Sequence, residues 1–272
     1  MFGVVGTKLF LLHFRQHLPQ TTIDYCEELF RKSARFGIFT SVVMFFAMVG
    51  NFGGNLNSVF DSVMVELVLG EKAGEAMVLL LAGFFLCLMK SARHLFVINL
   101  VHLVGNFSIL LSFAWVGHAS KYGLITQSLV VVHFVCLSYW LGAFLPLRQM
   151  CNNPESQVNL HKVAQKFGVY ALGYVALLIL AGLILAFLLL GGLKPLVASV
   201  YGNFFLLKLG VVALLLLMAG LNKFRIVPLL LQNETLGIKR LRVVIHSEIA
   251  LAFFILTITS LLTTSLPLPV RM

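Results

Sequence analysis

Residues that can bind a metal ion lie inside strongly apolar stretches of this sequence. In the stretch HFVCLSYWLGAFLPL, His133, Cys136 and Trp140 are spaced i, i+3 and i+7, which places them on one face of a helix. A polar side chain is costly in lipid, so each one within an apolar stretch is a functional hypothesis. Imidazole nitrogen and thiol sulfur both suit copper ions, so we interpret His133 and Cys136 as candidate copper ligands.

A second polar face lies in the preceding apolar stretch, residues 94–116. His102 and Asn106 are spaced i, i+4 in this stretch, which puts both on one helical face. The connection that follows, residues 117–123, is short, so we expect the two stretches to be antiparallel neighbours. We therefore expect His102 and His133 to face one another near the middle of a membrane. The alternative is an interhelical hydrogen-bond cluster of His102 and asparagine side chains without a metal.

The other candidate ligands come from the connection and from the first apolar stretch. Imidazole, thiol and thioether together suit Cu(I), and imidazole also suits Cu(II), so copper is the ion we expect. Methionines in a membrane helix, and a lone cysteine, are alternatively explained as packing. The predicted metal site comprises His118, His133, His102, Met44, Met48 and Cys136, with Asn106 and Trp140 beside it.

Two ionisable residues also lie within apolar stretches. Lys208 is near the outer end of its stretch, where its ammonium can reach the headgroups. Glu248 is near the inner end of the last stretch, where His246 or Arg242 is its simplest partner. The functional alternative for Glu248 is a proton acceptor or a cation exit site.

The elements that position these residues are membrane-spanning helices. Hydrophobic residues make up 60% of the 272 residues and charged residues only 11%, far below the roughly 25% of a soluble domain. We predict an all-α, polytopic membrane helix bundle with seven full spans and a short N-terminal apolar segment. The seven apolar stretches are approximately residues 33–52, 74–90, 94–116, 124–147, 166–190, 203–224 and 243–265.

The basic residues predict the orientation of the bundle. They gather before the first stretch and in alternate connections, which by the positive-inside rule lie in the cytoplasm. The acidic segment with Asp61, Glu66, Glu71 and Glu75 and the C-terminus are then outside. The net charge of +10 is therefore explained by topology, and no nucleic-acid partner is expected. The four cysteines lie at the cytoplasmic side or within the membrane, so no disulfide is expected.

The first 32 residues differ from the rest of the chain. Residues 1–14 are apolar, but they include Lys8 and are too few to cross a bilayer. We therefore divide the chain into an N-terminal cytoplasmic or interfacial segment, residues 1–32, and a transmembrane domain, residues 33–267. The alternative for residues 1–14 is the remainder of a shortened span.

Several motifs resemble those of the copper resistance protein D family of bacterial inner-membrane proteins. They begin with GHAS at 117–120 and H…YWLGAFLPL at 133–147. YGNFFLLKLG at 201–210 and AGLNKFRIVPLL at 219–230 are similar to two further family motifs. The last apolar stretch resembles the family's C-terminal helix, including its glutamate at Glu248.

This resemblance implies an integral membrane protein that moves copper from periplasm to cytoplasm. Family members usually have eight spans, so the first is missing here or reduced to residues 1–14. The residues at matching positions are Gly117, His118, His133, Trp140, Gly142, Tyr201, Lys208, Asn222 and Glu248. The outer acidic segment has only Met64 as a soft ligand, so we expect a periplasmic copper-binding protein to deliver the ion.

Two other functions fit the same residues. His102 and His133 on neighbouring helices match the axial ligands of a b-type haem, as in a membrane electron carrier or metal reductase. The protein can alternatively be a subunit that delivers copper to an enzyme during assembly. The sequence lacks the phosphate-binding motif GxxxxGK[ST], so ATP hydrolysis is not expected and we predict no enzyme activity.

Overall fold

The computed structural model describes residues 1–90, 95–117, 120, 122–190, 196–197 and 199–265. Its regular elements in these ranges are all helices, in agreement with the predicted all-α class. The α-helices are α1 (Phe2–Phe14), α2 (Gln20–Phe52), α3 (Ser62–Gly70), α4 (Lys72–Leu88), α5 (Leu95–Trp115), α6 (Leu124–Asn152), α7 (Pro154–Leu190), α9 (Val200–Leu221), α10 (Val227–Gln232) and α11 (Glu234–Thr264). The shorter turns are η1 (Arg15–His17), η2 (Leu56–Phe60) and the π-helix η4 (Asn222–Ile226).

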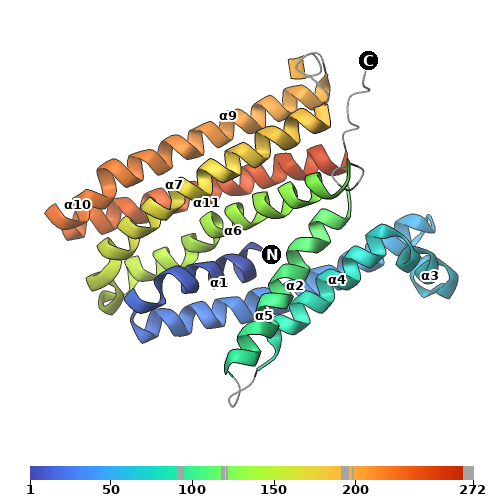
Figure 1. Ribbon diagram of the computed structural model, residues 1–272, viewed down its shortest axis with the longest axis horizontal. Helices are drawn as coiled ribbons and strands as arrows, with labels where there is room; N and C mark the ends of the chain where they lie inside the picture. Colours follow the sequence, from blue (N-terminus) through green and yellow to red (C-terminus); the bar gives the residue numbers. More distant parts are fainter. Residues whose placement is uncertain (91–94, 118–119, 121, 191–195, 198, 266–272) are drawn as a thin grey trace.

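The predicted polytopic membrane bundle is confirmed. Within the described residues, each of the seven apolar stretches overlaps a helix over most of its length (Figure 1). Within the described ranges, six segments are long and apolar enough to cross a membrane: α2, α5, α6, α7, the continuous α9–α10 segment and α11. The remaining stretch corresponds to α4, which has 17 residues and lies at the short end of spanning lengths.

The helices form two packed groups that share α1 and α2. One core joins α6, α7, α9, α10, α11 and the first turns of α2, and the other joins α4, α5 and the following turns of α2. Phe10 and Phe14 of α1 belong to the first core, whereas Val4 and Val5 belong to the second. Residues 1–14 are therefore a short helix packed within the bundle, between α2 and α6 (Figure 1).

Glycine pairs allow two of these helices to approach others closely. A Cβ at Gly142 of α6 would overlap the backbone of Gly6 in α1, so only glycine fits at this crossing. A Cβ at Gly83 of α4 would lie 2.7 Å from the carbonyl oxygen of Gly105 in α5. Small residues at such crossings are typical of packed membrane helices.

Three helices, α2, α7 and the 31-residue α11, extend well beyond the thickness of a membrane at their basic ends. α2 and α7 have 33 and 37 residues, about 50 and 55 Å, against roughly 30 Å for the hydrocarbon core. α6 ends at Asn152 and α7 begins at Pro154. Proline suits the first helical position, and it disfavours the helical conformation in the residue before it, here Asn153. The predicted boundary between residues 32 and 33 falls inside the continuous helix α2.

Polar contacts hold these extensions together. The hydroxyl of Thr22 lies 3.0 Å from Gln149 Oε1 and 2.8 Å from Ser156 Oγ. The ammonium of Lys166 donates to Nε2 of His17 at 2.7 Å. Desolvation and the neighbouring Lys166 and Lys162 lower the pKa of His17 below its usual value, which keeps the ring neutral as the acceptor.

Candidate functional site

His133 lies on α6 where that helix packs against α7. Its Nδ1 atom is buried and has no hydrogen-bond partner in the described residues. On α7, a Cβ added at Gly182 would lie 3.3 Å from Cε1 and 3.6 Å from Nδ1 of this imidazole. The absence of a side chain at Gly182 therefore provides the space that the ring occupies.

Lys208 of α9 is within electrostatic range of this imidazole. Nine residues separate His133 from the start of α6 at Leu124, and eight separate Lys208 from the start of α9 at Val200. At 1.5 Å per residue these separations are about 14 and 12 Å, so the two side chains lie at similar depths. The Lys208 ammonium is close enough to act electrostatically on the ring. The sequence placed Lys208 near the headgroups and did not predict this neighbour.

Cys136 lies one turn further along α6. Its side chain is buried, and it is close enough to Tyr174 of α7 for an electrostatic interaction between the two. The Tyr174 ring stacks on Tyr139 of α6, with ring centroids 3.9 Å apart and planes 9° from parallel. A sulfur atom and a phenol thus follow the imidazole along the α6–α7 contact.

His13 of α1 joins this aromatic group and was not predicted. Its Nδ1 lies 2.8 Å from the carbonyl oxygen of Leu9, so this nitrogen carries the proton and Nε2 is free to accept. Tyr174 donates to Nε2 at 3.4 Å, and the rings of Tyr139 and Tyr170 are also adjacent. The only signal in the sequence was that His13 is a polar residue at the end of an apolar stretch, LFLLHF.

Below Trp140, a partly open hollow of about 160 Å³ lies between α6, α7, α9, η4 and α11. Glu248 of α11 lines it and is only 3% exposed, with Oε1 lacking a hydrogen-bond partner among the described residues. Asn222 also lines it, and its Oδ1 is likewise buried and unpartnered within the described ranges. Two oxygen atoms with free lone pairs therefore share one hollow.

A proline explains the unusual backbone next to Asn222. Pro228 has no N–H to donate to the helix, so the preceding turn cannot complete its usual i→i−4 bonding. The chain forms the π-helix η4 over Asn222–Ile226 immediately before α10. Single π-turns often occur at functional sites. In the sequence, only the proline in LNKFRIVP indicated this irregularity.

These groups follow one another in a row along α6 and the helices packed on it. The seam residues, as we use the term below, are His133, Cys136, Trp140, Asn222 and Glu248, with Lys208 within electrostatic range of the first. The α7 residues that face this row have decreasing numbers as the α6 residues have increasing ones. They run from Gly182 through Tyr174 to Ala171 and Gly168. Because α6 and α7 are antiparallel, each step lies deeper in the bundle. The seam offers a nitrogen, a sulfur and then oxygen atoms to a cation.

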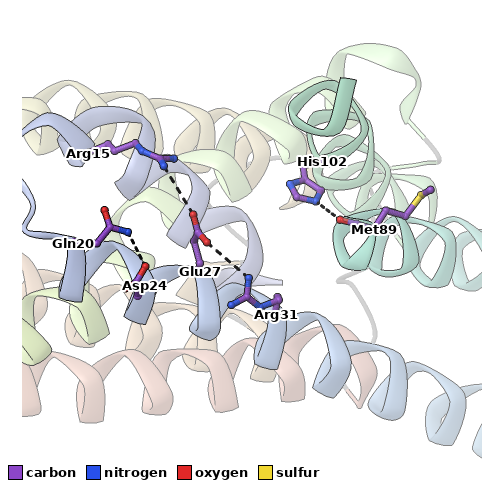
Figure 2. A network of polar contacts seen from close by, with 7 residues as sticks. All are labelled: Arg15, Gln20, Asp24, Glu27, Arg31, Met89 and His102. Carbon is purple, nitrogen blue, oxygen red and sulfur yellow. Dashed lines mark hydrogen bonds and ion pairs between the residues drawn. The ribbon is translucent and has the colours of Figure 1, made fainter. Parts of the chain in front are cut away.

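His102 and Asn106 lie elsewhere, against α4 and α2. The Nε2 atom of His102 is 3.0 Å from the carbonyl oxygen of Met89 (Figure 2). The centroid of its ring is 5.2 Å from that of the Phe30 ring. The expected meeting of His102 with His133 and Cys136 is not found, and no group of three or more His, Cys, Asp or Glu side chains in the described ranges could hold a metal. The reason is that the face of α5 with Gly105 packs on α4.

The structure describes two of the other three predicted ligands, Met44 and Met48. Met44 is 58% exposed on α2, among other exposed apolar side chains, so its thioether faces outward. Met48 is half-buried on the same helix. His118 lies outside the described residues. The ligand roles of these three residues stay predictions.

Two family models match the chain. The model described as copper resistance protein D-like, N-terminal domain, matches residues 1–127, and the model described as copper resistance protein D matches residues 161–262. The resemblance seen in the sequence motifs is thereby confirmed.

Two curated proteins are similar to the chain at low identity. Copper transport protein CutJ of Bacillus subtilis (strain 168) is 25% identical over 233 residues, a match that covers 80% of this chain and 41% of that protein. Inner membrane protein YebZ of Escherichia coli (strain K12) is 25% identical over 278 residues, covering 98% of this chain and 92% of that protein. The chain therefore spans about two fifths of CutJ and nearly all of YebZ. No solved structure matches it.

Proposed function

The chain belongs to the copper resistance protein D family, and from that premise we propose that it moves copper ions across the bacterial inner membrane along the seam. The family and the relatives support a membrane role in copper transport or resistance, and a transporter more than an enzyme. The observation that carries the finer proposal is the row of buried, unpartnered polar atoms from His133 to Glu248. Such groups are costly in an apolar bundle unless a cation, water or proton uses them.

Copper enters in this proposal from the periplasmic side. His118 precedes the outer end of α6 in the chain, and a periplasmic copper-binding protein supplies the ion. The free Nδ1 lone pair of His133 is the first buried ligand, and the sulfur of Cys136 is the next. Nitrogen and sulfur ligands suit Cu(I) in particular.

The inner part of the seam then receives the ion. The hollow of about 160 Å³ has room for several water molecules. There the Asn222 and Glu248 oxygens replace part of the hydration that the cation loses. An ionised Glu248 also offsets the charge of the cation, which reduces the cost of holding it in an apolar environment. Release follows toward the basic cytoplasmic layer, so the direction is periplasm to cytoplasm.

The test is copper accumulation by cells that express His133→Ala. We expect this variant to lose most copper-dependent accumulation, because it removes the first buried ligand of the seam. The matched control is His246→Ala, since His246 is an exposed histidine on α11. Normal accumulation by His133→Ala, at wild-type expression in the membrane, would contradict the proposal.

A further inference from the structure

A second group of buried polar atoms lies between α4 and α5, apart from the seam. It consists of Cys87 at the end of α4 and of His102 and Asn106 on α5. Within the described residues, His102 Nδ1 and Asn106 Oδ1 have no hydrogen-bond partner, and the Cys87 sulfur accepts one long hydrogen bond from Asn106 Nδ2.

The hydrogen bond of His102 fixes which of its nitrogens is free. A carbonyl oxygen only accepts, so the contact of 3.0 Å with the carbonyl of Met89 requires the proton to be on Nε2 (Figure 2). The Nδ1 atom therefore carries a lone pair. It is buried and has no partner in the described part of the chain. A histidine oriented by a carbonyl on one nitrogen, with the other nitrogen free, is the usual arrangement of a metal ligand.

Asn106 presents a second free acceptor. Its Nδ2 group donates to the carbonyl oxygen of His102 at 2.6 Å and lies 3.8 Å from the sulfur of Cys87. The residue is 9% exposed, and Oδ1 is buried without a partner in the described ranges. The amide thus points at Cys87 and links that sulfur to the turn that carries His102.

Cys87 supplies the sulfur. It is 1% exposed, and a Cβ added at Gly105 would lie 2.9 Å from its Sγ atom. The glycine therefore leaves the space that the sulfur occupies against α5. Cys87 is a free cysteine, as are the other three cysteines of the chain.

We propose that Cys87 and His102, supported by Asn106, form a soft-metal site that binds one Cu(I) ion. Binding displaces the thiol proton, so the ion joins a thiolate and a neutral imidazole, and the thiolate and Cu⁺ together have no net charge. A complex without net charge has a lower free-energy cost of burial in an apolar environment than a charged one. The Lys8 ammonium acts electrostatically on both ligand residues, which stabilises the thiolate and disfavours a dication.

This site is separate from the seam and does not depend on the proposed direction or route of transport. It does not require three ligands, because Cu(I) is satisfied by few soft donors. Its place at the end of α4 suits storage or delivery of copper at the cytoplasmic side.

The experiment uses the full chain in detergent, in a background that retains Cys87 alone (Cys26→Ser, Cys136→Ser, Cys151→Ser). Anaerobic titration with Cu(I), in competition with bicinchoninate, should give one bound ion per chain. Adding His102→Gln should weaken binding at least about tenfold, as loss of a metal-site partner does. The matched control retains Cys151 alone, since Cys151 is equally buried, and it should not bind.

Unchanged affinity after His102→Gln, or equal binding by the Cys151-only protein, would overturn the site. If a cysteine variant fails to fold, the test uses the wild-type protein and measures modification of Cys87 by N-ethylmaleimide with mass spectrometry. At a detergent concentration that makes Cys87 reactive, Cu(I) should protect this cysteine. His102→Gln should remove that protection. Protection that persists in His102→Gln overturns the site. Binding at Cys87 should persist in His133→Ala, which separates this proposal from the transport route.

Discussion

The lysine within electrostatic range of His133 determines how firmly the outer part of the seam can hold a cation. When Lys208 is protonated, its charge opposes a copper ion on the imidazole of His133. A transport site must bind strongly enough to admit an ion and weakly enough to release it. Lys208 therefore fits a role in weakening the site so that the ion moves on.

We expect Lys208→Met to bind copper more tightly and to transport it more slowly. A unit charge about 6–10 Å away changes an ion's energy by about 2–3 kcal/mol at an effective dielectric constant near 20, so affinity should rise about tenfold or more. Cu(I) competition titration and a copper-uptake time course measure the two effects. Lys72→Met, at an exposed lysine that begins α4, should change neither. Weaker binding by Lys208→Met would show that the lysine supports the site instead.

The sequence identified which single residues are polar within the membrane, but not which of them meet. His133, Cys136, Trp140 and Glu248 were all selected by polarity or by motif. The predicted grouping of His102 with His133 is not found among the described residues, because spacing along one helix does not say which neighbouring helix a face contacts. Gly182 and Cys87 were missed as site residues, since a glycine and a cysteine are both ordinary in apolar helices.

At the scale of elements, α1 connects the two packed groups. Its buried side chains contribute to both cores, and its Gly6 lies against Gly142 where α1 crosses α6. This contact places α1 against the same helix that carries His133 and Cys136. The position of α6 in the seam thus depends on a short helix that is too short to span a membrane alone.

Substitution of Gly142 tests this dependence. In Gly142→Ala the new methyl group would overlap the backbone of Gly6, so α1 and α6 must separate. We expect a loss of about 1–3 kcal/mol in the free energy of unfolding, the usual cost of overpacking. Thermal unfolding in detergent measures it. Gly173→Ala on α7 is the control, since a Cβ there has no neighbour within 4 Å, and an equal loss in this control would show that the crossing is not special.

The helices were largely predictable because lipid imposes a simple length and polarity rule. The extensions of α2, α7 and α11 beyond the membrane were not predicted. Their charged residues lower the local hydropathy, so the pattern predicts loops between spans at these positions. They are helical because they pack on one another through contacts such as those of Thr22 with Gln149 and Ser156. The π-helix before Pro228 likewise results from one missing backbone N–H, which a hydropathy pattern does not detect.

At the scale of the whole molecule, the basic residues lie on one end of the bundle. The extension of α2 holds Arg31, Lys32 and Arg35, and that of α11 holds Lys239, Arg240 and Arg242. Positive residues are retained on the cytoplasmic side during insertion. This end of the molecule is therefore expected to face the cytoplasm, which places His133 in the outer half of the bundle and Glu248 nearer the inner side.

Labelling of introduced cysteines tests that orientation, on which the proposed direction of transport depends. Ser265 follows α11 at its outer end and Lys239 lies near its inner start, and both are exposed. In intact spheroplasts, a membrane-impermeant maleimide should label Ser265→Cys and leave Lys239→Cys unlabelled until the membrane is permeabilised. The native cysteines give a low background because all four are buried. The reverse pattern would place His133 on the cytoplasmic side, and an ion that passes His133 first would then be leaving the cell.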